Sequence, residues 1–421
     1  MAKEQAPAPE GVSPFLFGDV PSGKLLKKFI VKGEVTNLLA IKGGRVYTMA
    51  GKVYDTGTVL IDGKVIADVY QGNKIPAGAK TVDASGKMVF PGFIDAHSHL
   101  GIVEEIYREE GDDCNEITDP VTPHLRAVDA IYPEDLGFAD ALSGGVTTVV
   151  TGPGSANVLG GEMVAIKTHG RLVEHMVVKY PVGLKAALGE NPKRSYGSQK
   201  KSPYTRMASA ALIREALAKA GDYIRKMEKC EQGNGEQPDR DLKMEALARV
   251  LKGEIPLRVH AHRADDIMTA VRLAEEFGVR LVVEHCTEGY KVAPELASRG
   301  VMAVLGPVIT NRAKVELQGI TLENARILAE AGVTFGIMTD HPVVPIQYLS
   351  LSAGLTVRGG LTEERALRAI TLDAAGIIGM EDRLGSLEPG KDADIAIFEG
   401  HPFDTRTRVG AVIVSGEKVI G

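Results

Sequence analysis

Eight short apolar runs, separated by helical stretches and loops, occupy the chain between residues 91 and 383. Apolar strands that alternate with helices are typical of βαβ units, whose strands form a parallel sheet. Eight such strands are the number that closes a (β/α)₈ TIM barrel, so the sequence predicts an α/β fold of this kind. The predicted strands are residues 93–96, 147–151, 163–167, 182–187, 257–261, 281–285, 301–305 and 333–339. The clearest predicted helices are residues 208–230, 265–277, 321–331 and 362–378.

Shorter β-type runs, separated by turn signals, flank this region at both ends of the chain. In residues 38–89 the turn signals are Gly43-Gly44, Asp62-Gly63 and Ser85-Gly86. Near the C-terminus, Ser415-Gly416 stands in the same way between two apolar runs. The repeated pattern indicates that both ends contribute strands to one small β-structure.

These patterns predict three parts. Residues 36–90 and 384–421 together form a small β-sandwich domain, and residues 91–383 form the barrel. Residues 1–35 match neither pattern and are predicted to be an irregular N-terminal arm.

The composition excludes several classes of partner. A net charge of -6 and an aromatic content of 5% without tryptophan provide neither a basic surface nor stacking platforms for nucleic acid. The sequence contains neither an apolar stretch long enough to span a membrane nor a signal-peptide core. The three cysteines, Cys114, Cys230 and Cys286, are too few and too scattered for a disulfide framework, which favours a cytoplasmic location.

Polar residues end four of the predicted strands. His97 and His99 end the first strand, and residues two apart on a strand point to the same side, so both can reach one metal ion at about 2.0–2.1 Å. A lone His-x-His pair is weak evidence, because such histidines are often ordinary core or surface residues. Later strand ends carry His260 with His262, His285, and Asp340. Since the carboxyl ends of barrel strands meet at one mouth, we expect these residues to converge there.

The same residues resemble the amidohydrolase superfamily, in particular its imidazolonepropionase-like and prolidase-like branches. The resemblance covers residues 38–421 and depends on PGFIDAHSH at 91–99, GGVTTVV at 144–150, the strand-end histidines and aspartate, and GSLEPGKDADIAIF at 385–398. It is specific for the superfamily and much less specific for a substrate.

The resemblance implies a site that binds one or two divalent ions, with zinc as the expected metal. It implies that His97, His99 and His260 are ligands, that Asp340 is a ligand and proton shuttle, and that His285 is a catalytic residue that binds a second ion or contacts substrate. Members with two metals carry a carboxylated lysine on the fourth strand.

Lys185 lies at about the position of that lysine. Glu190 is a rival acidic ligand, and Lys185 could equally be a surface or substrate-binding lysine. His262 is assigned to the surroundings of the metal or to the substrate. Arg194 and Arg312 could hold a substrate carboxylate as bidentate forks, or could form salt bridges within their own loops.

The implied activity is hydrolysis of a carbon–nitrogen bond in a small amide, lactam or cyclic imide by a metal-activated water. A prolidase-like metallo-dipeptidase that acts on linear dipeptides or N-acyl amino acids is the first alternative. A non-catalytic scaffold with the same fold is the second, because fold alone does not prove activity. The expected partner is a small-molecule substrate, and a homo-oligomer is left open.

Overall fold

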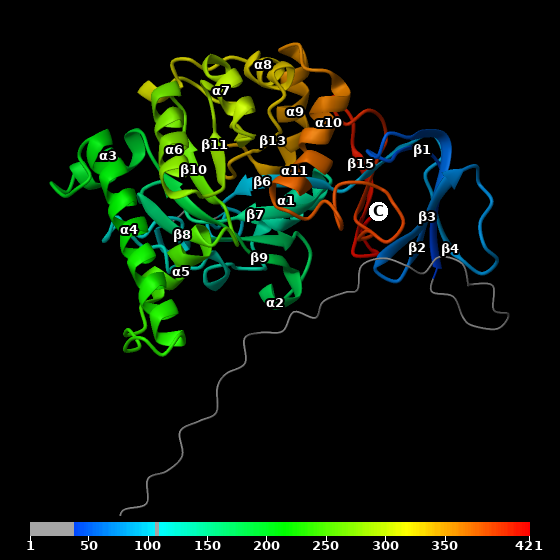
Figure 1. Ribbon diagram of the computed structural model, residues 1–421. Helices are drawn as coiled ribbons and strands as arrows, with labels where there is room; N and C mark the ends of the chain where they lie inside the picture. Colours follow the sequence, from blue (N-terminus) through cyan, green and yellow to red (C-terminus); the bar gives the residue numbers. More distant parts are fainter. Residues whose placement is uncertain (1–37, 106–108) are drawn as a thin grey trace, which may run out of the picture. The chain divides into compact units, whose positions relative to one another are not determined.

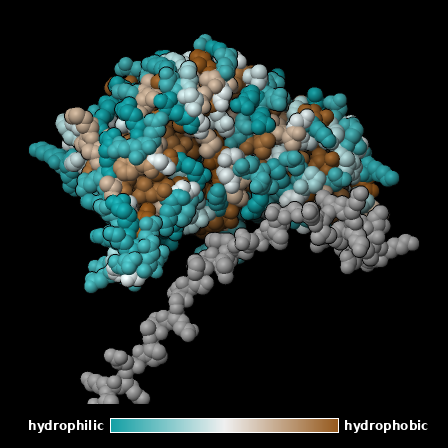
Figure 2. All heavy atoms as spheres, in the orientation of Figure 1, coloured by the Kyte–Doolittle hydropathy of each residue, from teal (hydrophilic) through white to brown (hydrophobic). Residues whose placement is uncertain are grey.

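The computed structural model describes residues 38–105 and 109–421, so the arm predicted at residues 1–35 lies outside the described part of the chain. The described residues belong to one compact unit. Its strands form two separate eight-stranded sheets, which are seen in Figure 1 with most helices around one of them. Figure 2 shows that the visible face is largely hydrophilic, with apolar side chains gathered in patches between the elements. No helix in the described residues combines the length and apolarity that a membrane crossing requires.

The first sheet is the predicted barrel, with the strand order β13-β12-β11-β10-β9-β8-β7-β6. All eight predicted strands are confirmed. They are β6 (Phe93–Ser98), β7 (Val146–Thr151), β8 (Leu159–Lys167), β9 (Val177–Ala187), β10 (Leu257–Ala261), β11 (Leu281–His285), β12 (Met302–Leu305) and β13 (Phe335–Ile337). The ends of this order approach each other, and the backbone N–H of His99 donates to the carbonyl oxygen of His341 at 2.9 Å. The barrel is therefore nearly closed.

One strand departs from the expected all-parallel arrangement. The strand β8 pairs antiparallel with both β7 and β9. Only residues 152–158 connect β7 to β8, whereas a parallel crossover needs about a dozen residues or more. The short connection therefore forces β8 to return antiparallel, although the remaining neighbouring strands pair in parallel.

Helices cover the outside of this sheet (Figure 1). They are α1 (Leu136–Ser143), α2 (Val173–Met176), α3 (Glu190–Gly197), α4 (Arg206–Glu231), α5 (Leu242–Leu251), α6 (Ala264–Phe277), α7 (Ala293–Ser298), α8 (Asn324–Ala331), α9 (Leu349–Arg358), α10 (Glu363–Ala369) and α11 (Leu372–Ile377). The predicted helix at 362–378 is two helices, because Thr371 has a non-helical backbone (φ -136°, ψ -101°). Ala374 and Ile377 of α11 pack with Ile94 and Val150 from the strands. These side chains belong to one buried apolar cluster between α11 and the strands.

The second sheet is built from both ends of the chain, as predicted. Its order is β16-β15-β14-β5-β1-β2-β3, and β4 also pairs with β1. The strands are β1 (Leu38–Tyr47), β2 (Val53–Asp62), β3 (Val65–Gln71), β4 (Lys80–Asp83), β5 (Met88–Pro91), β14 (Ile395–Phe398), β15 (Val409–Val414) and β16 (Glu417–Ile420). Ile41 and Ile61 from the N-terminal strands share one buried core with Ile395 and Ile413 from the C-terminal strands. The exact domain boundaries, 36–90 with 384–421 and 91–383, remain our proposal.

Three of the four predicted turns are confirmed and one is wrong. Asp62-Gly63 joins β2 to β3, Ser85-Gly86 lies between β4 and β5, and Ser415-Gly416 joins β15 to β16. In the last turn both residues have positive φ angles (49° and 81°), as a two-residue hairpin of type I′ requires. Gly43-Gly44 lies inside β1, where the register with β2 shifts on either side of Gly44. This pair is a β-bulge rather than a turn, and Gly43, at φ 85°, adopts the backbone conformation that glycine favours.

Candidate metal centre

Six polar side chains from the strand ends form two buried groups of potential metal ligands. One group is His97, His99 and Asp340, and the other is His260, His262 and His285. Within each group, one ligand atom of each residue lies within 4.8 Å of the others. The structure therefore brings the six strand-end residues together in two buried groups. Both groups suit a divalent ion, since imidazole nitrogens and carboxylate oxygens are ligands for such metals.

The first group is held together by the carboxylate of Asp340. Its Oδ1 atom lies 3.2 Å from Nε2 of His97 and 3.3 Å from Nε2 of His99. Burial alone would raise the pKa of Asp340, but the neighbouring His285, His97 and His99 hold that pKa well below its ordinary value. The carboxylate is therefore ionised at neutral pH and can serve as a metal ligand.

The second group contains three imidazole rings in close contact. The ring centroids lie 4.7 Å apart for His260 and His262, 4.3 Å for His260 and His285, and 4.4 Å for His262 and His285. Burial lowers the pKa of all three histidines well below the ordinary value. They are therefore neutral at neutral pH, which is the state in which imidazole binds a metal.

Each of the five histidines has a polar partner close to Nδ1, an ion-pair contact for His97 and a hydrogen bond for each of the other four, which leaves Nε2 for the centre. The partners of Nδ1 are Glu284 Oε2 for His97 (3.0 Å), Gly152 O for His99 (2.7 Å), Ser155 Oγ for His260 (2.9 Å), Thr287 Oγ1 for His262 (2.7 Å) and Gly306 O for His285 (2.9 Å). A carbonyl or carboxylate oxygen can only accept, so the proton of a neutral ring lies on Nδ1 where such a partner is present. Nε2 then carries the lone pair, as metal-ligating histidines held by outer hydrogen bonds require.

The proton on His99 has a further consequence. Burial lowers the pKa of this ring, but Cys114 and Asp340 outweigh burial and raise the pKa to about 10. His99 therefore carries an extra proton, which a metal ion bound through Nε2 would displace.

Lys185, on β9, lies fully buried beside both groups. Its Nζ atom is 3.5 Å from Nε2 of His97, and its charge contributes to the lowered pKa of His260. Burial also lowers the pKa of Lys185 itself. A buried lysine close to both ligand groups fits a bridging role after carboxylation, which remains a proposal.

A buried ion pair between Arg258 and Glu284 lies next to His97. Arg258 Nε donates to Glu284 Oε1 at 2.5 Å, and Arg258 Nη2 donates to the carbonyl oxygen of Ala96 at 2.7 Å. Burial would raise the pKa of Glu284, but Arg258 and His97 hold it at about 2. Because the other carboxylate oxygen of Glu284 lies 3.0 Å from Nδ1 of His97, the pair connects β10 and β11 to β6.

Two strand ends at the centre have strained backbones. His285 (φ 68°), Cys286 (φ 48°) and Asp340 (φ 56°) occupy the left-handed region, which residues other than glycine rarely adopt. Strain of this kind is held only where the surrounding structure fixes it, and it clusters at functional sites. Here it turns the ends of β11 and β13 so that their side chains reach the centre.

The other predicted residues have different positions. Arg194 and Arg312 are exposed, and neither guanidinium forms an ion pair with any residue in the described ranges. Their role in binding a substrate carboxylate remains a prediction. Glu190 is half-buried, and its Oε2 accepts from the backbone N–H of Glu316 at 3.2 Å, so this oxygen is already engaged.

Five residues that support the site were not predicted. They are Ser155, Arg258, Glu284, Thr287 and Glu316. The signal available in the sequence was only that Ser155 and Glu316 lie in the segments that follow the second and seventh predicted strands. Nothing in the sequence distinguishes these residues from neighbouring polar residues, because their roles arise from contacts across the barrel.

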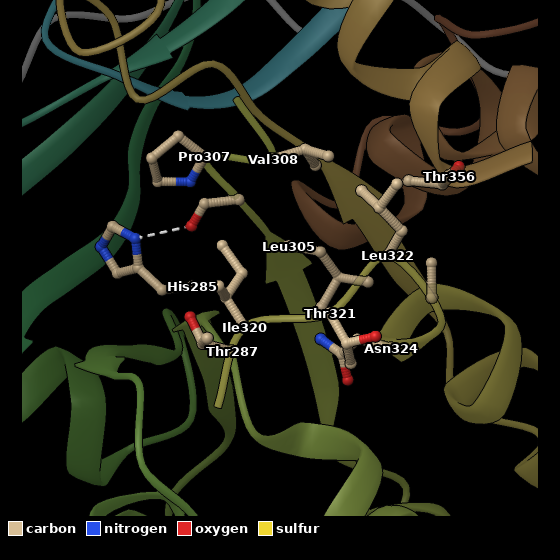
Figure 3. Close-up of a pocket in the computed structure, with 12 residues that line it drawn as sticks. His285, Thr287, Leu305, Pro307, Val308, Ile320, Thr321, Leu322, Asn324 and Thr356 are labelled. Atoms are coloured by element: carbon tan, nitrogen blue, oxygen red, sulfur yellow. Dashed lines mark hydrogen bonds between the residues drawn. The ribbon is translucent and has the colours of Figure 1, made fainter. Parts of the chain in front are cut away.

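A small apolar pocket adjoins the second group of histidines (Figure 3). His285 and Thr287 stand on one side of it, and Asn324 and Thr356 line it as well. Its other lining side chains are mostly aliphatic and include Leu305, Pro307, Val308, Ile320 and Leu322. Mostly apolar walls with a few polar groups are typical of small-molecule sites.

Comparisons with known proteins agree with this geometry. The model of the amidohydrolase family matches residues 88–419. An amidohydrolase structure from Thermotoga maritima MSB8 is 44% identical, covers 91% of this chain and 99% of that chain, and has a TM-score of 0.88. The imidazolonepropionase of Brucella suis biovar 1 (strain 1330) is 28% identical over 87% of this chain and 94% of its own length.

A further relative is the amidohydrolase tasK of Hapsidospora irregularis, which is 29% identical over 82% of this chain. The chain spans only 38% of the length of that protein. The family match covers most of the chain, and the two buried groups provide donors that suit divalent metal ions. The chain thus belongs to the amidohydrolase family and is a metal-dependent hydrolase of carbon–nitrogen bonds.

Proposed function

We propose that this enzyme hydrolyses an amide, lactam or cyclic imide bond in a small molecule that carries an apolar group near the scissile carbonyl. The observation that carries the proposal is the position of His285, which belongs to the second ligand group and also lines the apolar pocket. A substrate whose carbonyl lies at the centre can therefore place an adjoining group among Leu305, Val308 and Ile320. We also propose zinc as the metal, because histidine and aspartate are common zinc ligands. We propose the cytoplasm as the compartment, because all three cysteines are free.

His97, His99 and Asp340, the first ligand group, have the donor atoms for the ion that would activate water. A bound divalent ion supplies a nucleophile by lowering the pKa of water to about 7. His97 and His99 would hold that ion through Nε2. Asp340, ionised and at the mouth, would accept the proton of the attacking water and return it to the leaving nitrogen. His285 would border the apolar group of the substrate, because its ring lines the pocket.

The choice between a cyclic and a linear substrate depends on the bridging ligand. In the alternative prolidase-like reading, a carboxylated Lys185 joins two ions and the substrate is a dipeptide or an N-acyl amino acid. Mass spectrometry of the native protein, with and without bicarbonate, would detect carboxylation. Retained metal stoichiometry in a Lys185→Met variant would contradict the bridging role.

A substrate panel tests the proposal directly. Hydantoins, lactams, N-acyl amino acids and dipeptides should be compared in pairs that differ only in an isobutyl or methyl group, with the protein loaded with zinc. Each methylene in an apolar pocket is worth roughly 1–3 kcal/mol, so we expect about 10-fold or more in kcat/KM for the larger group. Equal kcat/KM values for both groups would contradict an apolar substrate pocket.

A matched pair of variants separates pocket effects from global damage. Val308→Phe should fill the pocket and reduce the preference for the larger group without changing metal content. Val53→Phe changes a side chain that is 50% exposed on the second sheet and should behave as wild type.

A further inference from the structure

We propose that His260, His262, His285 and Glu316 form a closed four-donor site for one metal ion, with Glu316 as the fourth ligand. The proposal rests on the metal dependence described above and concerns the second ligand group alone. Glu316 lies in a short 3-10 helix, η4 (Val315–Leu317), within the segment between β12 and α8. With Glu316 as a ligand, the segment at residues 306–323 would be part of the metal centre.

Two buried atoms in this group have no hydrogen-bond partner among the described residues. They are Oε1 of Glu316 and Nε2 of His262, in side chains that are only 1% and 2% exposed. Oε1 of Glu316 lies 3.5 Å from Nε2 of His260 and 3.6 Å from Nε2 of His262. These separations exceed the usual 2.7–3.2 Å of a hydrogen bond. Burying an unpaired carboxylate oxygen is costly, so a cation between these atoms would compensate both of them.

The separations also fit a common ligand geometry. Donor atoms at about 2.0–2.1 Å from a tetrahedral ion lie about 3.4 Å from one another. The distances from Glu316 to the two histidines match this edge length within a few tenths of an ångström. His285 would provide the remaining donor, since one of its ring nitrogens lies within 4.8 Å of those of His260 and His262.

Glu316 is positioned for this role by contacts with the end of β9 and the start of α3. Its Oε2 atom accepts from the backbone N–H of Glu190 at 3.0 Å, and its own backbone N–H donates to Oε2 of Glu190 at 3.2 Å. Gly189, at φ 82°, leaves room for the carboxylate, because a Cβ atom there would lie 2.6 Å from Oε2 of Glu316. One oxygen is thus anchored and the other faces the histidines, as in the histidines themselves.

The number of protein ligands distinguishes the two groups. Four protein donors make a closed site, which is typical of structural ions, whereas catalytic sites keep an open position. His97, His99 and Asp340 leave a position for water or substrate, but the second group does not. The second ion would restrict the motion of the segment at residues 306–323. This segment contributes Pro307, Val308 and Ile320 to the apolar pocket.

Metal titration tests the site without any substrate. The protein should be stripped with a chelator, and zinc binding measured by calorimetry and elemental analysis. We expect wild type to bind two ions. Glu316→Gln and His262→Ala should each weaken one of them at least 10-fold and leave the other unchanged. Glu323→Gln, an exposed residue of the same segment, should match wild type, and His99→Ala should weaken only the other ion.

A second measurement addresses the segment itself. Trypsin can cleave after the exposed Arg312, and zinc should slow this cleavage at least 10-fold in wild type but not in Glu316→Gln. Wild-type zinc affinity and stoichiometry in both Glu316→Gln and His262→Ala would overturn the four-donor site. Zinc-independent cleavage in wild type would overturn the restricted motion of the segment. Neither readout uses hydrolysis, so failure of the substrate panel would leave this test intact.

Discussion

The Oγ atom of Ser155 lies 2.9 Å from Nδ1 of His260, although 105 positions separate the two residues in the chain. The contact fixes the ring of His260 so that Nε2 faces the other ligands. Outer hydrogen bonds of this kind are worth about 10–100-fold in metal affinity.

The first prediction follows from this contact. Ser155→Ala removes the anchor of His260 but no ligand, so we expect a 10–100-fold weaker zinc affinity with unchanged stoichiometry at saturating metal. Competition with a chromophoric chelator would measure the change. Ser298→Ala, at an exposed position on α7, is the matched control. Wild-type affinity in Ser155→Ala would show that the hydroxyl does not orient the ring.

Asp340 gives the second prediction. Asp340→Asn keeps an oxygen that can ligate weakly near His97 and His99, but the amide cannot accept a proton at neutral pH. We expect turnover to fall by roughly 10²–10⁴-fold. Because the two histidines remain, metal should still bind with reduced affinity, and the rate defect should persist at saturating metal. If added zinc restored near-normal turnover, Asp340 would be a ligand only and not the proton shuttle.

The third prediction concerns the buried pair of Arg258 and Glu284. Arg258→Met leaves the carboxylate of Glu284 buried without its main partner, which should destabilise the fold by about 3–5 kcal/mol. Denaturant unfolding of the metal-free protein would measure the loss. Arg299→Met removes an exposed pair with Glu275 and should cost less than about 1 kcal/mol.

The same variant should change how stability depends on pH. In wild type the pKa of Glu284 is held at about 2, below its value of about 4.3 in the unfolded chain, so its contribution is lost as pH falls through this range. Without Arg258, burial dominates and raises the folded pKa above the unfolded value. The variant is then penalised as pH rises, and the stability difference from wild type should shrink between pH 7 and about pH 4. A constant difference would contradict this account.

The sequence was sufficient to predict the barrel and the meeting of the polar strand ends, because both depend on local patterns. Apolar runs mark the strands, and the polar residues that end them, such as His97 and His285, must meet at the mouth once the sheet closes. The direction of β8 was not predicted, because an apolar run does not show which way a strand enters the sheet. Only the short connection from β7 carried that information.

The outer parts of the site could not be predicted for a different reason. Glu316 and Thr287 are polar loop residues of ordinary type, and their importance comes from partners far away in the chain. The lysine at position 185 could be placed near the centre by analogy, but its complete burial depends on packing that no local pattern records.

The last prediction tests how the second sheet is assembled. Deleting residues 384–421 removes β14, which pairs antiparallel with β5, and removes Ile395 and Ile413 from the core shared with the N-terminal strands. It also removes Asp392 and Asp394, which pair with the buried Lys167 at the end of β8. An exposed strand edge and an unpaired buried charge both favour aggregation, so light scattering should detect aggregates of the truncated protein.

Deleting only residues 417–421 removes the edge strand β16, whose side chains are exposed or half-buried, and should leave the protein monodisperse. A monodisperse product after the longer deletion would show that the N-terminal strands form a stable sheet without the C-terminal segment.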